Sequence, residues 1–289
     1  MILAGGPVAN KLKKELIQKV AELKRRGITP GLTAIRVGSD PASELYVSRK
    51  IMACEEVGIE SRSHILSDDV TDEELLELIR KENEDSSTHG ILVQLPLPAT
   101  IDTQAVIEAV APEKDVDGFH PFNVGRVSTN VGGFAPCTPK GIMKILDFHG
   151  LDCRGKDVVV VGASNIVGKP LARLMLAKEA TVTTCHIETK DVAEHTRRAD
   201  ILVVCAGRPS LVTKDMVKKG VILIDVGVNR VPDSSSPRGF RVVGDIASAA
   251  RDMAYAYTPV PGGIGPMTVA MLLENTIIAA EAIDKGIVV

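Results

Sequence analysis

One stretch of the sequence runs a strand straight into a glycine turn: Val158-Val159-Val160-Val161-Gly162-Ala163-Ser164-Asn165-Ile166-Val167-Gly168. The four valines predict a buried strand, and Lys169-Pro170 after the turn predicts the start of a helix. Backbone amides at such a helix start can bind a pyrophosphate. The spacing is not Gly-x-Gly-x-x-Gly, because only Gly162 and Gly168 are present, so the glycines would equally suit a tight turn that binds no ligand.

The alternation of strand and helix continues after this turn. Further strands are predicted at residues 181–185, 201–205 and 221–225, with helical stretches between them. Such spacing indicates βαβ units and a parallel sheet. The last two strands end in Ala206-Gly207-Arg208 and Val226-Gly227-Val228, and glycines at the carboxyl ends of parallel strands leave room for a ligand. This half of the chain is therefore predicted to bind a nucleotide.

The flanking segments show the same α/β pattern. Helices are predicted at residues 12–23, 40–58, 70–84, 138–150 and 266–282, and strands at residues 32–37, 90–95 and 241–243. At 289 residues the chain is long for a single hydrophobic core. Two α/β domains with a cleft between them are therefore expected.

The composition argues against several classes of function. The net charge is −3 and lysine and arginine form no long run, so no nucleic-acid partner is expected. No stretch approaches the roughly 18 apolar residues of a membrane span, and the first residues do not resemble a secretory signal, so a cytoplasmic location is expected. The five cysteines form no Cys-x-x-Cys pair, which predicts reduced thiols and no metal site.

Several polar side chains are candidates for a site in the N-terminal half. Tyr46 and Lys50 are four residues apart and share one helix face, although most such pairs are ordinary surface pairs. Gln94 lies in an apolar strand, where a buried amide needs hydrogen-bond partners. Asp115 and Asp117 follow in a loop that would suit either a solvated turn or an aspartate-lined pocket, and the pattern leaves both open.

The sequence resembles a known family, the bifunctional methylenetetrahydrofolate dehydrogenase/cyclohydrolases. The matching segments span nearly the whole chain in order: YVSRK at residues 46–50, VQLPLP at 93–98, PEKDVDG at 112–118, GASNIVG at 162–168 and PVPGGIGPMT at 259–268. The resemblance implies oxidation of 5,10-methylenetetrahydrofolate to the methenyl form by a nicotinamide dinucleotide, followed by hydrolysis to 10-formyltetrahydrofolate. This reaction pair belongs to one-carbon metabolism and supports purine and amino-acid biosynthesis. A homodimer built through the dinucleotide domain is also implied.

The resemblance extends to domains and single residues. Residues 1–139 and 266–289 would form the folate-binding catalytic domain, and residues 140–265 a Rossmann-type dinucleotide-binding domain. Catalytic roles are implied for Tyr46, Lys50, Gln94 and Asp117, and folate contacts for these residues with Leu95, Pro261, Gly262 and Gly263. Cofactor contacts are implied for Gly162, Ala163, Ser164, Ile187 and Val228.

The residue types suit this chemistry. Tyr46 would pack on the folate, Asp117 would bind the pterin, and Lys50 would move protons with Gln94 as its hydrogen-bond partner. A cationic methenyl bridge forms when hydride leaves, so a neutral lysine would be tolerated better than a charged one and could activate water. Lys50 is expected on an exposed helix face, where partial burial and donation from the Gln94 amide would both disfavour the ammonium form.

The cofactor implied by the resemblance is NADP, with NAD as the alternative. Glu188 falls near the distance from Gly162 at which Rossmann enzymes place an acid on the ribose 2′-hydroxyl, which favours NAD. Lys190 or Arg208 would instead reach a 2′-phosphate. A weak preference for NADP is predicted.

Two other functions fit parts of the pattern. A different dehydrogenase on a similar two-domain scaffold would reduce a small keto or shikimate-like acid, but it would not require the four catalytic candidates together. A nucleotide-binding regulatory module without turnover would be expected to have a broken catalytic set, whereas all four residues are present.

Overall fold

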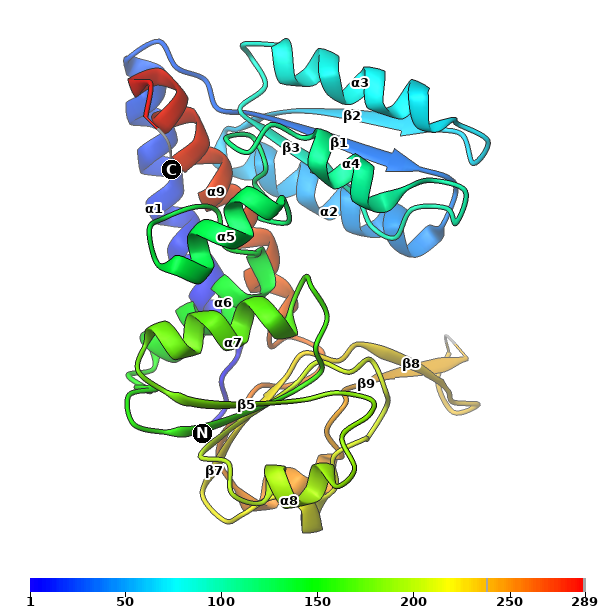
Figure 1. The fold of residues 1–289 in the computed structure, drawn as a ribbon, viewed down its shortest axis with the longest axis vertical. Coiled ribbons are helices and arrows are strands. Elements are labelled where there is room, and N and C mark those ends of the chain that lie inside the picture. The colour runs from blue at the N-terminus through cyan, green and yellow to red at the C-terminus, as the bar shows by residue number, and fades with distance from the viewer. Residues whose placement is uncertain (238, 288–289) are drawn as a thin grey trace. The chain divides into compact units, whose positions relative to one another are not determined.

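The computed structural model describes residues 1–237 and 239–287, and the chain divides into two compact units. Unit 1 comprises Met1–Ala9 and Thr138–Thr268, and unit 2 comprises Asn10–Cys137 and Val269–Val289. Each unit contains a parallel sheet with helices (Figure 1), so the predicted two-domain α/β class is confirmed. The division falls inside two long helices, α1 (Gly5–Arg25) and α9 (Gly265–Lys285).

Unit 2 is built on a three-stranded parallel sheet in the order β2-β1-β3. Its elements are β1 (Gly31–Val37), α2 (Pro41–Val57), β2 (Glu60–Leu66), α3 (Asp72–Glu84), β3 (Gly90–Val93), α4 (Thr103–Ala109) and α5 (Pro121–Thr129). The central strand β1 is buried along its whole length. Ile35 and Val37 pack with Leu75 and Ile79 of α3 in one apolar core.

Unit 1 contains a five-stranded parallel sheet in the order β10-β7-β6-β4-β5. Its strands are β4 (Asp157–Val161), β5 (Thr181–Cys185), β6 (Ile201–Val204), β7 (Val221–Asp225) and β10 (Ala254–Tyr257), and β8 (Asn229–Pro232) pairs with β9 (Phe240–Val243) as a hairpin. The helices are α6 (Cys137–Phe148), α7 (Gly168–Ala177) and α8 (Val192–Thr196), with 3₁₀ turns at Lys214–Met216 and Ser248–Met253. The chain runs from β4 to β5 on one side and returns to β6 on the other, which makes a topological switch point between β4 and β6.

Two helices differ from their predicted form. Helix α6 begins at Cys137, so Thr138 and Pro139 lie in its first turn and do not precede it as a cap. Helix α9 is long and apolar enough to cross a membrane by length and composition, contrary to the expectation that no stretch approaches such a span. However, 61% of its apolar window is buried within the fold, which is the pattern of a core helix.

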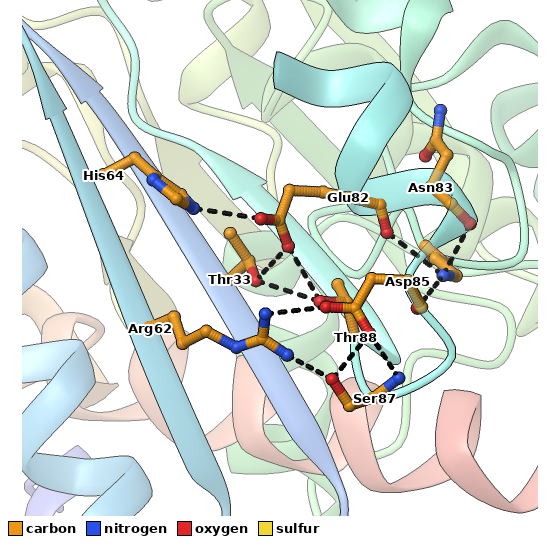
Figure 2. A network of polar contacts seen from close by, with 9 residues as sticks. Thr33, Arg62, His64, Glu82, Asn83, Asp85, Ser87 and Thr88 are labelled. Carbon is orange, nitrogen blue, oxygen red and sulfur yellow. Dashed lines mark hydrogen bonds and ion pairs between the residues drawn. The ribbon is translucent and has the colours of Figure 1, made fainter.

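A buried polar network joins β1, β2 and the C-terminal end of α3 (Figure 2). The Glu82 carboxylate accepts hydrogen bonds from the hydroxyls of Thr33 at 2.7 Å and Thr88 at 2.8 Å. Its other oxygen lies 3.0 Å from Nε2 of His64 on β2. Burying a carboxylate is costly unless it is hydrogen-bonded, and these partners meet that need while attaching the edge strand β2.

Candidate active site

Helix α2 carries the predicted tyrosine–lysine pair. Asp40 caps its N-terminus by accepting a backbone N–H at 2.8 Å, Pro41 lies in the first turn, and Gly58 ends the helix in the left-handed conformation (φ 84°). These signals fix the helix, so Tyr46 and Lys50 lie one turn apart. Tyr46 is 43% exposed, whereas Lys50 is only 8% exposed.

The burial of Lys50 corrects the expectation of an exposed position. Its Nζ donates a hydrogen bond to Gln94 Oε1 at 3.1 Å. The structure does not show the expected donation from the Gln94 amide to the lysine: the Gln94 carbonyl oxygen accepts from the lysine, and the amide nitrogen donates to Leu95 O at 2.6 Å. Gln94 also lies one residue beyond β3 and not within it, because Pro96 has no N–H with which to continue the ladder.

The loop that follows residue 112 is built around the buried side chain of Asp115. Its Oδ1 accepts hydrogen bonds from the N–H groups of Gly118 and Phe119, both at 3.1 Å. Its Oδ2 accepts from the His120 N–H at 2.8 Å and from Asn123 Nδ2 at 2.9 Å. Burial raises the pKa of Asp115 to about 7, although these hydrogen bonds oppose the rise. The solvated-turn interpretation is therefore wrong, and Asp115 acts as the internal anchor of the loop.

Asp117 is partly buried in the loop that Asp115 anchors. Burial raises the pKa of Asp117, while the positive charge of Lys50 and a hydrogen bond from the Cys137 thiol lower it. Asn275 of α9 supports the preceding residue, because its Nδ2 donates to Val116 O at 2.8 Å. Lys50 and Asp117 both belong to unit 2, and the charge of Lys50 acts on the Asp117 carboxylate.

A small pocket that opens to solvent adjoins this loop. It is lined by Ile91, Val93, Leu95, Ile107, Val110, Asp115, Asp117 and Phe119. Of the residues predicted to contact the substrate, Leu95 and Asp117 line this pocket. Both oxygens of Asp115 are engaged within the loop, so Asp117 is the carboxylate that this apolar lining offers to a flat ring with N–H donors.

The predicted folate-facing loop, Pro261-Gly262-Gly263, belongs to unit 1. Gly262 has φ 101°, and its carbonyl accepts the Gly5 N–H at 3.0 Å. A Cβ at Gly263 would lie 2.6 Å from Pro259 O, so a side chain does not fit there. Gly262 is therefore favoured by its backbone conformation, and Gly263 by the lack of space for a side chain.

The predicted pyrophosphate turn lies at the switch point of the unit 1 sheet. Gly162 has φ 123°, and a Cβ there would lie 2.5 Å from Cys205 O. A Cβ at Gly168 would lie 1.9 Å from Gly162 O. Ser164 Oγ accepts the Val167 N–H at 3.2 Å just before α7 begins. Both glycines are required by the turn itself, and the turn stands where open α/β sheets bind ligands.

Two apolar side chains are exposed beyond the carboxyl ends of β5 and β7. Ile187 is 88% exposed and Val228 is 59% exposed. Glu188 is also exposed, and its N–H donates to His186 Nδ1 at 3.2 Å. Exposed apolar side chains on such an edge offer a contact surface for the flat rings of a ligand.

Two buried acids on the same edge were missed by the sequence analysis. Asp225 is 4% exposed and Asp245 has no exposed surface. Burial raises the pKa of Asp225 to about 6. A Cβ at Gly227 would lie 2.1 Å from Asp245 Oδ1, and one at Gly244 would lie 1.8 Å from Asp225 Oδ2. The nearby glycines were the available signal, because each makes room for a carboxylate.

Comparison with known proteins places this geometry in a family. The model for the tetrahydrofolate dehydrogenase/cyclohydrolase catalytic domain matches residues 3–117, and the model for the NAD(P)-binding domain of the same family matches residues 136–284. The chain is 52% identical over 288 residues to the bifunctional protein FolD of Nautilia profundicola, with 99% of each chain covered.

Two solved structures agree with these matches. The bifunctional FolD methylenetetrahydrofolate dehydrogenase/cyclohydrolase of Campylobacter jejuni is 48% identical with a TM-score of 0.94, and the match covers 97% of this chain and 98% of that one. The Trypanosoma brucei FolD, solved with NADP and an inhibitor, is 41% identical with a TM-score of 0.93 and 97% of each chain covered. The resemblance seen in the sequence is confirmed, and the chain belongs to the tetrahydrofolate dehydrogenase/cyclohydrolase family.

Proposed function

We propose that this chain oxidises 5,10-methylenetetrahydrofolate to 5,10-methenyltetrahydrofolate with NADP, and then hydrolyses the product to 10-formyltetrahydrofolate. Family membership supports both reactions. The observation that carries the proposal is the hydrogen bond from buried Lys50 to Gln94, in the unit that also holds Asp117. A shikimate-like dehydrogenase or a regulatory module would have no need for this set.

The folate would be bound chiefly by residues of unit 2. The exposed ring of Tyr46 offers a face for packing, and Leu95 contributes to the apolar wall of the pocket. Ionised Asp117 would accept hydrogen bonds from the N–H groups of the pterin. Folate contacts are also proposed for Pro261, Gly262 and Gly263. The proposed folate-binding domain comprises residues 1–139 and 266–289.

Lys50 is proposed to move the protons of the hydrolysis. Water adds to the methenyl carbon and loses one proton, which leaves a hydroxyl group on that carbon. The hydroxyl then loses its proton to solvent as it becomes the formyl carbonyl, the bond from the carbon to N5 breaks, and N5 gains a proton. A neutral lysine amine can take the first proton and deliver it to N5. The carbonyl oxygen of Gln94 can hold Nζ throughout, because both forms of the amine carry N–H donors.

NADP would supply the hydride acceptor and would be held by the Rossmann-type domain, proposed as residues 140–265. The proposed contacts are Gly162, Ala163, Ser164, Ile187 and Val228. The fit is supported by the position of the glycine turn at the switch point and by the exposed apolar side chains beside it.

The test follows both reactions in one cuvette. Purified enzyme with methylenetetrahydrofolate and NADP should give reduced nicotinamide together with a transient methenyl absorbance. Methenyltetrahydrofolate supplied without nucleotide should be hydrolysed faster than in buffer alone. An enzyme that carries out neither reaction with NADP or NAD would refute the proposed function.

We also propose that the protein is a homodimer built through the dinucleotide domain and that it acts in the cytoplasm. The family resemblance supports the dimer. Light scattering on the purified protein should give twice the chain mass of 30.7 kDa. A monomer at micromolar concentration would contradict the proposed assembly without affecting the proposed reaction.

A further inference from the structure

Asp245 lies two residues beyond β9, is completely buried, and receives hydrogen bonds from two different segments of unit 1. Its Oδ2 accepts from the N–H groups of Ala206 at 2.7 Å and Gly207 at 2.8 Å, immediately after β6. Its Oδ1 accepts from Asn229 Nδ2 at 2.8 Å, shortly after β7. One carboxylate therefore joins the ends of two neighbouring strands.

Asp225, the last residue of β7, accepts hydrogen bonds from the backbone on both sides of this region, including the backbone of Asp245 itself. Its Oδ1 accepts from the N–H groups of Gly227 at 3.1 Å and Asp245 at 2.8 Å. Its Oδ2 accepts from the Ile246 N–H at 3.0 Å. The two acids thus accept hydrogen bonds from backbone groups of three segments. The bonds accepted by Asp225 are buried, and those accepted by Asp245 are partly buried.

The side chains next to these bonds point to a role in ligand binding. Val228 is 59% exposed and lies between Gly227 and Asn229, each of which is bonded to one of the two carboxylates. Arg208 is exposed and follows the two amides bonded to Asp245. Both side chains stand at the carboxyl ends of β6 and β7, beside the switch point where such sheets bind ligands.

We propose that Asp245 is a positioning residue for the dinucleotide, because it fixes the two loops that present Val228 and Arg208. This inference rests on the proposed function, since it concerns the cofactor of the dehydrogenase step. Hydrolysis of methenyltetrahydrofolate consumes no nucleotide. Loss of the Asp245 contacts should therefore separate the two activities, which a general loss of folding would not do.

The experiment compares Asp245→Ala and Asp245→Asn with a matched control. Alanine removes all three accepted hydrogen bonds, and the KM for NADP should rise by about tenfold or more. Asparagine keeps one carbonyl oxygen for the Ala206 and Gly207 amides, so it should restore much of the affinity. Hydrolysis without nucleotide should stay within about twofold of wild type in both variants. Asp252→Ala is the control, because this aspartate pairs at 2.9 Å with Lys214 and its side chain is 65% exposed.

Several outcomes would overturn the proposal. One is an unchanged KM for NADP in folded Asp245→Ala, and another is an equal loss of both activities in Asp245→Asn. If Asp245→Ala does not fold, Asn229→Ala decides, because it leaves the Ala206 and Gly207 contacts of Asp245 in place. It removes the hydrogen bond at Oδ1 and a longer one from Asn229 Nδ2 to Val243 O at 3.4 Å. A rise in its KM for NADP supports the proposal, and no change overturns it. Absence of both activities in the wild-type enzyme would instead refute the proposed function.

Discussion

Lys50 combines burial with a hydrogen bond to Gln94, which is an unusual position for an ordinary lysine. Methionine would fill a similar space but cannot carry a proton. We expect Lys50→Met to lower the hydrolysis rate by about 10²-fold or more and to depress the dehydrogenase, while urea unfolding stays cooperative. Arg49→Met is the control, because Arg49 is the neighbouring residue and its side chain is exposed. If the folded Lys50→Met enzyme hydrolyses methenyltetrahydrofolate at the wild-type rate, Lys50 is not the proton carrier.

Asp117 is predicted to determine folate affinity. In Asp117→Asn an amide replaces a carboxylate that can only accept hydrogen bonds, and the amide matches the N–H groups of the pterin less well. The KM for the folate should therefore rise about tenfold, while the KM for NADP is unchanged. Because burial raises the pKa of Asp117, its carboxylate forms at a higher pH than an ordinary aspartate. The wild-type KM for the folate should therefore fall as pH rises through that range, and the variant should lose this dependence. Glu113→Gln, exposed in the same loop, is the control, and equal weakening of both substrates would indicate a structural role.

Glu188 bears on the choice between NADP and NAD. It is exposed after β5, where a carboxylate would repel a 2′-phosphate, and we expect only a modest preference for NADP. Glu188→Lys should raise the ratio of kcat/KM for NADP over NAD by about tenfold, or roughly 1.4 kcal/mol. Glu194→Lys on α8 serves as an exposed control. A wild type that prefers NAD tenfold would contradict the NADP assignment, and an unchanged ratio in Glu188→Lys would place Glu188 outside the site.

Among the elements, those governed by local signals were predicted well from the sequence. The capping aspartate and proline place the start of α2, and the strands predicted at residues 181–185 and 221–225 are confirmed. Strand β2 was missed because Ser61, Arg62 and Ser63 give it no apolar alternation. It is attached by long-range contacts such as that between His64 and Glu82, which no local pattern reveals.

The C-terminal end of α3 is closed by a lysine that the sequence analysis did not single out. Lys114 is 7% exposed, and its Nζ donates to the carbonyl oxygens of Glu82 at 3.2 Å, Asn83 at 2.7 Å and Asp85 at 2.8 Å. Helix ends leave carbonyl groups without partners, and here one side chain satisfies three of them.

We therefore expect Lys114→Met to lower the free energy of unfolding by about 2–4 kcal/mol, because three carbonyl groups would lose a charged donor. Urea denaturation followed by circular dichroism measures this change. Lys81→Met, on α3 itself and with a side chain 65% exposed, should change stability by less than about 0.5 kcal/mol. Equal stabilities for the two variants would show that the Lys114 contacts contribute little.

For the whole molecule, the sequence predicts two α/β domains and most of the proposed site residues, because their motifs are local. It does not reveal the partners that hold them. Asp115 anchors a loop that folds over its carboxylate. Asp245 accepts hydrogen bonds from amides that lie 39 and 38 residues earlier in the sequence. The structural role of such an aspartate is visible only when distant segments are brought together. In the sequence, an aspartate near a glycine is equally typical of an ordinary turn.

The proposed division of binding between the units leads to a prediction for the whole chain. A bound ligand stabilises the state that it binds, by about 2.7 kcal/mol at a hundredfold excess over Kd, so amides that exchange through local opening should be protected about 100-fold. NADP should protect residues 162–168, 206–208 and 227–229 of unit 1, and a folate substrate analogue should protect residues 46–50, 94–98 and 115–119 of unit 2. Hydrogen exchange with mass spectrometry measures both patterns, and Asp245→Ala should lose only the first. Protection of the unit 2 segments by NADP with none in unit 1 would contradict the assignment, because the glycine turn and the loops held by Asp245 would then bind no nucleotide.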